Sequence, residues 1–323
     1  MSFEPKADSF EKVRRGQAGT QIAAWDETNT WFGPLREYAK VSAHVRALLP
    51  SGTIAVLTPS PLFDQASTST RQAPEKRLMF LQWEIETLVL KQREQFSSSF
   101  ALLKKIFFED ISFEINPKFA ITGASALLET TLARRQGPLS LSCMLFAWMG
   151  EVVANVYGDA SDFRRIELVS SAPTEVVRVL PKPDLGAVCF VDLSRQGERV
   201  DESSWAEWCA DGLARISWKQ GLIRSLIDLF RSLERSSYGD DPADLETLTA
   251  QVYVLDEIIS LQPSETGRWA ERAILNTRRG DRGGALDDLK RFFAFHERET
   301  APAAIVSLFD ELKKNNELPR SLV

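Results

Sequence analysis

The chain has 323 residues, of which 44% are hydrophobic and 26% are charged, and its formal net charge is −6. This composition excludes global disorder and predicts two domains, or one domain with a helical appendage. The acidic balance, with arginine pairs scattered among acidic residues, argues against a nucleic-acid partner.

Cysteine and histidine are scarce. The three cysteines, Cys143, Cys189 and Cys209, are widely spaced without a Cys-x-x-Cys pair, so neither a zinc site nor a disulfide framework is predicted. His44 and His296 are the only histidines, and neither has a metal-ligand partner at a suitable spacing. We therefore expect no metal and no cofactor.

The sequence has no apolar stretch typical of a secretory signal near its first residue, and no run suited to crossing a bilayer. These features predict reduced cysteines, a cytoplasmic location and no membrane partner.

Residues 1–73 are predicted to be an N-terminal extension and linker. Periodic apolar residues indicate a short helix over 34–49. The following stretch, rich in Gly, Pro, Ser and Thr, is typical of a loop or linker that could include a short strand at 53–57. This extension could supply a binding contact or a dimer arm.

Residues 74–200 are predicted to form an α+β domain. Helical patterns cover 74–93, 97–108, 124–135 and 140–157, and Val-rich segments typical of strands follow at 166–170, 175–180 and 187–193. The helix at 140–157 is mainly apolar but contains Glu151 and Asn155, which favours a buried central helix over a membrane span. Helices leading into an antiparallel sheet make this domain α+β.

Residues 201–323 are predicted to be helical, with helices over 203–214, 218–236, 244–261, 265–279, 284–298 and after Pro302. The segment from Trp269 to Phe293, with a turn at Gly280, has the helix–turn–helix rhythm of tetratricopeptide repeats. We expect tetratricopeptide-like repeats here, with a plain helical bundle as the alternative.

Three stretches together resemble one family. They are Leu103–Phe113, Leu132–Ser142, which contains Arg-Arg-Gln-Gly-Pro-Leu-Ser-Leu, and Cys189–Gly197. In this order they are similar to SirB-type transglutaminase-like proteins, which carry a tetratricopeptide-like segment after the core. The resemblance covers about residues 98 to 298, and its most specific part is the Arg-Arg string.

The resemblance implies a papain- or transglutaminase-like α+β core. In catalytic members of that superfamily, a Cys at the start of the central helix is the nucleophile. A His on the following strand is its base, and an Asp on the next strand orients the His.

This sequence departs from that pattern. The nucleophile position falls near Leu139 or Ser140, and Cys143 lies about one helical turn further along. Glu175 occupies the position of the histidine, and Asp192 occupies the position of the family's Asp. The resemblance thus implies a pseudoenzyme, because losing both nucleophile and base removes most catalysis.

Three functional hypotheses follow. The first is a non-catalytic protein-interaction or scaffold module that binds a protein partner through its helical repeats. The second is a hydrolase or transferase that uses Cys143, or Glu175 with Asp192, in the retained cleft. The third is a structural scaffold that self-associates.

Overall fold

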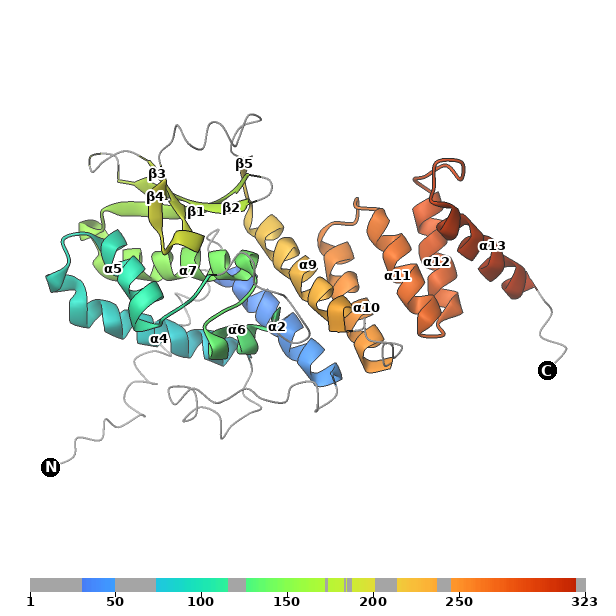
Figure 1. Ribbon diagram of the computed structural model, residues 1–323, viewed down its shortest axis with the longest axis horizontal. Helices are drawn as coiled ribbons and strands as arrows, with labels where there is room; N and C mark the ends of the chain where they lie inside the picture. Colours follow the sequence, from blue (N-terminus) through green and yellow to red (C-terminus); the bar gives the residue numbers. More distant parts are fainter. Residues whose placement is uncertain are drawn as a thin grey trace, which may run out of the picture. The chain divides into compact units, whose positions relative to one another are not determined.

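The computed structural model describes residues 31–49, 74–115, 126–171, 174–182, 184, 188–200, 214–236 and 245–317 (Figure 1). The described ranges exclude the strand considered at 53–57, Cys209, and residues 203–213 of the helix expected at 203–214. The helix prediction is wrong at Ala214, which lies in a strand. The helices are α2 (Phe32–Leu48), α4 (Pro74–Gln92), α5 (Ser99–Lys105), α6 (Leu128–Arg134), α7 (Leu139–Tyr157), α9 (Trp218–Ser236), α10 (Leu245–Leu261), α11 (Gly267–Arg278), α12 (Arg282–Phe293) and α13 (Ala303–Glu317). The strands are β1 (Phe163–Ser171), β2 (Thr174–Pro181), β3 (Cys189–Asp192), β4 (Glu198–Val200) and β5 (Ala214–Arg215).

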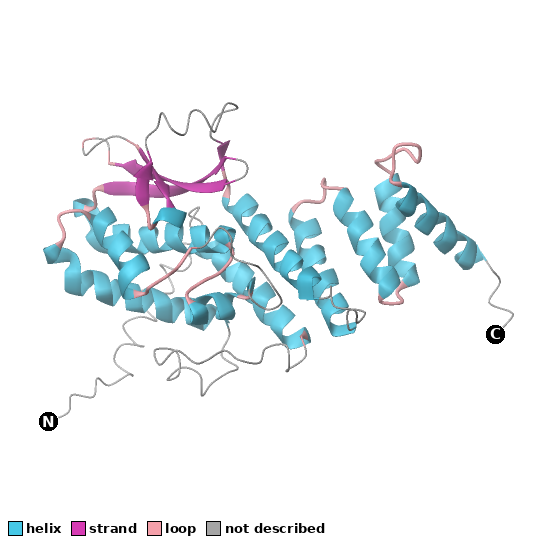
Figure 2. Cartoon of the chain, viewed as in Figure 1, coloured by secondary structure: helices cyan, strands magenta, loops and turns pink. Residues whose placement is uncertain are grey.

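The predicted α+β class is confirmed: most described residues are helical, and the strands form one small antiparallel sheet (Figure 2). The strand order is β4-β3-β2-β1-β5. β1 and β2 form a hairpin in which Leu168 pairs with Val177 and Glu167 pairs with Arg178. The three-residue β4 and the two-residue β5 were not predicted, because strands this short have no measurable alternation.

Helix α7 is the centre of the α+β part. It packs against β1 and β2 on one side and against α4 and α5 elsewhere (Figure 1). Gly150 allows the close approach to the sheet, because a Cβ there would lie 2.2 Å from Cδ1 of Ile166. The stretch Leu139–Ala160 is long and apolar enough to cross a membrane, but 72% of its most apolar window is buried inside the protein. The core helix of a soluble protein has these same properties.

Helix α4 carries two apolar stripes. The helical spacing of Leu78, Leu81, Ile85 and Leu88 predicts one buried stripe, and the first three are buried whereas Leu88 is half-buried. The second stripe is exposed, and its members are Met79, Phe80, Trp83 and Leu90.

The chain divides into two compact units. The first contains residues 1–39, 72–117 and 139–222, and the second contains residues 40–71, 118–138 and 223–323. Both units are discontinuous in sequence, and residues of α2 and of α9 occur in both. The division into domains at 1–73, 74–200 and 201–323 stays a prediction.

The helical segment α10–α13 lies in the second unit. Its successive helices α10, α11, α12 and α13 pack on their neighbours in chain order. Alanines at 270, 273 and 285 permit close helix packing, and Leu289 and Phe292 fill the space between the helices. Helix α12 begins two residues before the predicted start, because the Asp281 carboxylate accepts a hydrogen bond from the backbone N–H of Gly284 at 2.9 Å and caps it.

Candidate functional site

The predicted nucleophile position lies at the first turn of α7. Leu139 is half-buried there, and Cys143, one turn along the helix, is fully buried. Met144, Leu145 and Phe146, which follow it on the helix, are also buried. A thiol in these surroundings packs as a small apolar side chain.

The retained acid, Asp192, is at the end of β3. Its Oδ1 accepts hydrogen bonds from the backbone N–H of Ser194 at 2.9 Å and from the Ser194 hydroxyl at 2.6 Å. Its Oδ2 lies 3.5 Å from Nε of Arg195. The carboxylate thus caps the 3₁₀ turn Leu193–Arg195.

Glu175 lies in β2, and its backbone pairs with Ser170 of β1. Asp192 pairs instead with Glu198 of β4. The side chain of Glu175 is outside the described part of the structure. The structure therefore puts Leu139 and Cys143 on one helix and places Glu175 and Asp192 in different ladders of the sheet.

Sequence reasoning missed Glu151 as a buried titratable group. Both of its carboxylate oxygens accept the backbone N–H of Trp31, at 3.1 and 3.0 Å. Burial raises the pKa of Glu151 from 4.5 to about 8, against the lowering effects of that hydrogen bond and of the Arg165 charge. A carboxyl group inside an otherwise apolar helix was the available indication.

A second missed carboxylate is Glu167, which is 5% exposed and is surrounded by three arginines. Arg178 is its direct cross-strand partner and donates to it at 2.5 Å. Arg165 lies two residues earlier on the same face of β1, and Arg215 pairs with Val169, two residues later. Their Nε atoms lie 3.7 and 3.3 Å from the carboxylate, so the strand register gathers these charges on one face.

This cluster borders a cavity of about 280 Å³, lined by Trp31, Arg165, Glu167, Arg215, Ile216, Ser217 and Trp218. Of the Arg164–Arg165 pair, Arg164 is exposed, whereas Arg165 is half-buried beside Glu167.

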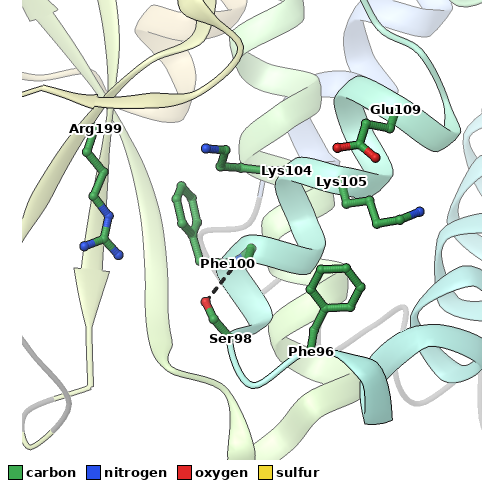
Figure 3. A pocket seen from close by; sticks show the side chains of 8 residues that line it. Phe96, Ser98, Phe100, Lys104, Lys105, Glu109 and Arg199 are labelled. Atoms are coloured by element: carbon green, nitrogen blue, oxygen red, sulfur yellow. Dashed lines mark hydrogen bonds between the residues drawn. The ribbon is translucent and has the colours of Figure 1, made fainter.

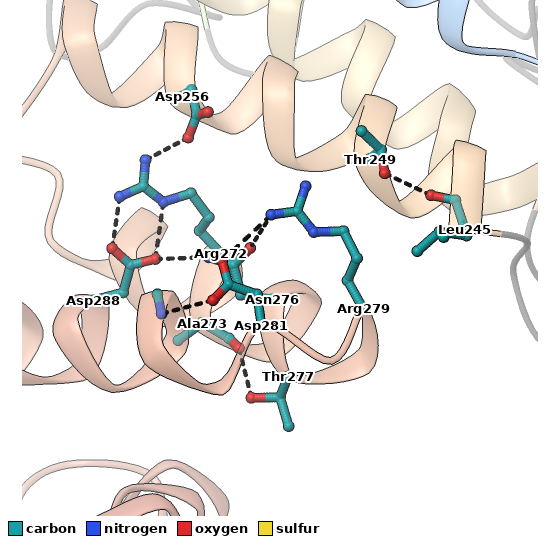
Figure 4. Close-up of polar contacts among 11 residues, drawn as sticks. Leu245, Thr249, Asp256, Arg272, Ala273, Asn276, Thr277, Arg279, Asp281 and Asp288 are labelled. Carbon is teal, nitrogen blue, oxygen red and sulfur yellow. Dashed lines mark hydrogen bonds and ion pairs between the residues drawn. The ribbon is translucent and has the colours of Figure 1, made fainter. Parts of the chain in front are cut away.

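In the second unit, Arg272 of α11 connects three helices (Figure 4). It donates to Asp256 of α10 and, at 2.6 and 2.9 Å, to both carboxylate oxygens of Asp288 in α12. Asn276 also donates to Asp288, at 3.2 Å. Burial lowers the pKa of Arg272, but the bonds to Asp288 and Asp256 outweigh it and raise the pKa overall.

Trp269, on the same helix, has the guanidinium carbon of Arg272 at 4.9 Å and that of Arg291 at 4.7 Å from its ring. The contact with Arg291 of α12 joins α11 and α12 a second time, whereas Arg272 lies on the same helix as Trp269. Ile274 on α11 and Phe295 after α12 remain exposed, at 41% and 73%.

Both histidines make packing contacts. His44 stacks on Tyr253 with the ring centroids 4.0 Å apart. His296 stacks on Phe292 at 4.3 Å and hydrogen-bonds the Thr266 hydroxyl at 2.6 Å. Among the residues that the structure describes, no group of three or more His, Cys, Asp or Glu side chains could hold a metal ion.

Comparisons with protein-family models, with curated proteins and with solved structures found no match.

Proposed function

We propose that this chain is a non-catalytic, SirB-type transglutaminase-like protein of the cytoplasm that binds a protein partner through its tetratricopeptide-like helical segment. The observation that carries the proposal is the Arg272 link, which joins α10, α11 and α12 through Asp256 and Asp288. Arrays of stacked helices that are held in register present extended surfaces suited to protein partners.

The exposed apolar side chains of this segment support the same function. Ile274 and Phe295 lie on and beside the linked helices, and large apolar side chains at a surface are the usual centres of protein interfaces. The Arg272 link would hold the helices still, so a partner would not have to order them on binding.

The α+β part supports the non-catalytic half of the proposal. At the positions that the family resemblance assigns to chemistry, Cys143 packs in the core and Asp192 caps a turn. Each of these side chains therefore has a structural role, in core packing or in capping a turn.

Affinity capture from the cytoplasm of the source cells tests the proposal, with the full chain as bait. The variant Ile274→Ser/Phe295→Ser should lose the captured partner. The matched control Phe80→Ser/Trp83→Ser removes two exposed apolar side chains from α4 and should retain it. Retention by the first variant with loss by the second, or no partner with the unaltered chain, would overturn the proposal.

A further inference from the structure

A second cavity, of about 460 Å³, lies in the α+β part between α5 and β4 (Figure 3). Its lining residues are Phe96, Ser98, Phe100, Ala101, Lys104, Lys105, Glu109 and Arg199. This volume is in the range of small-molecule sites, which is about 300–1,000 Å³. None of these lining residues belongs to the helical segment on which the proposed function rests.

The charges at this cavity are not balanced. Lys105 is paired with Asp110 at 2.6 Å, and in Figure 3 it points away from the strand that carries Arg199. Lys104 reaches toward that strand. Within the described ranges, neither Lys104 nor Arg199 has an ion-pair partner. Among the lining residues themselves, the three cations Lys104, Lys105 and Arg199 outnumber the one acid, Glu109. Beside the lining, the Asp162 carboxylate accepts from the Ser98 hydroxyl at 2.5 Å.

The fold keeps these two cations in place. The turn between β3 and β4 contains Gly197 at a φ of +73°, and a Cβ there would lie 3.0 Å from the Phe108 ring and 3.3 Å from Cδ of Lys104. The aliphatic part of Lys104 therefore packs under the turn while its ammonium group stays at the cavity. The backbone of Arg199 is held by pairing with Val191 of β3, and its exposed side chain lines the cavity from that strand.

The thiol beside Arg199 does not compensate the guanidinium charge. Burial raises the pKa of Cys189, and the Arg199 charge only partly offsets this. At neutral pH the thiol is therefore uncharged.

The rest of the lining is mainly apolar. Phe100 is 5% exposed and half-buried Phe96 lies on the other side of α5 in the view of Figure 3. The Asp162 carboxylate already caps the α5 N-terminus by accepting from the Phe100 backbone N–H at 3.1 Å, so the backbone of α5 does not supply the anion site. A mainly apolar cavity with a few charged groups suits a ligand that has an apolar part and a charged part.

We propose that this cavity binds a small amphipathic anion, with Lys104 and Arg199 holding its carboxylate or phosphate and Phe100 contacting its apolar part. A guanidinium group can bond such an anion through two N–H groups, while the lysine ammonium adds a point charge.

Titration calorimetry on the full chain tests this proposal, with naphthoate as the probe and naphthalene methanol as its neutral analogue. Naphthoate should bind, and the neutral analogue should bind at least about ten-fold more weakly. Added salt should lower the affinity for naphthoate but not the affinity for the neutral analogue. Equal affinity for the two compounds, or no naphthoate binding at millimolar concentration, would overturn the proposal.

Variants locate the site. Lys104→Gln and Arg199→Gln, on different elements, should each reduce naphthoate affinity by about ten-fold without changing the melting temperature. The matched control Arg164→Gln removes an exposed arginine from β1 and should bind naphthoate as the unaltered chain does. Unchanged affinity in whichever of the two variants folds would show that naphthoate binds elsewhere and overturn the assignment.

Discussion

Glu151 is a half-buried residue whose pKa the fold raises strongly. Its carboxyl group accepts the backbone N–H of Trp31. Because burial raises its pKa to about 8, the folded protein retains a proton that the unfolded chain releases near pH 4.5. Folding therefore becomes less favourable as the pH rises between these two values.

This linkage gives a pH prediction. Over that window, Glu151 should reduce the free energy of unfolding by up to ~1.4 kcal/mol per pH unit. Glu151→Gln keeps an acceptor for the Trp31 N–H and cannot ionise, so its stability relative to the unaltered chain should increase with pH. Urea unfolding at several pH values measures this. The exposed control Glu94→Gln should leave the pH dependence unchanged, and a parallel shift of Glu151→Gln at all pH values would contradict the linkage.

Cys143 gives a second prediction at this scale. Because the thiol is fully buried, iodoacetamide at neutral pH should label it only after denaturation. Peptide mass spectrometry would follow Cys143 and half-buried Cys189 separately. Fast, selective labelling of Cys143 in the native protein would instead indicate an activated nucleophile.

At the scale of elements, the apolar periodicity predicted the secondary structure of the long segments. The predicted helices 218–236 and 140–157 agree with α9 and with α7 to within one residue, and the three predicted strands correspond to β1, β2 and β3. Each is long enough for its apolar pattern to specify one period. The helix predicted from residue 124 is observed as α6, which begins at Leu128, where the Ser42 hydroxyl accepts the first backbone N–H. That contact joins residues far apart in the sequence, so no local pattern contains it.

The candidate sites also differ in whether the sequence could predict them. The family resemblance drew attention to Cys143 and Asp192. The sequence could not locate the Glu167 cluster or the cavity between α5 and β4, because both are produced by strand register. Arg178 and Glu167 are eleven residues apart and meet only once the hairpin forms. Lys104 and Arg199 come from elements separated by the whole of α7.

The link between helices can be tested through stability. Arg272→Ala leaves Asp288, which is 4% exposed, without its main partner, and we expect a loss of about 3 kcal/mol in the free energy of unfolding. Arg298→Ala is the matched control, because Arg298 pairs with Asp310 at an exposed position and should cost about 0.5 kcal/mol. Urea unfolding measures both. Equal losses would show that the Arg272 link is no more than a surface ion pair.

At the scale of the whole molecule, the proposed functions are assigned to different parts of the chain. The α+β part contains the cavity for a small anion, and the helical segment contains the proposed partner surface. Substitutions at Lys104 or Arg199 should therefore leave partner capture unchanged, and substitutions at Ile274 or Phe295 should leave naphthoate binding unchanged. Loss of both activities in a folded single variant would contradict this separation.

The most direct test of the central claim, that the helical segment contacts the partner, is site-specific photocrosslinking in source-cell extract. A photoreactive phenylalanine at position 274 or 295 should crosslink one discrete protein, because these exposed positions lie on or beside the linked helices. The same group at Phe80 on α4 or at Arg164 on β1 should not crosslink that protein. Crosslinking from position 80 or 164, with none from 274 or 295, would contradict the account.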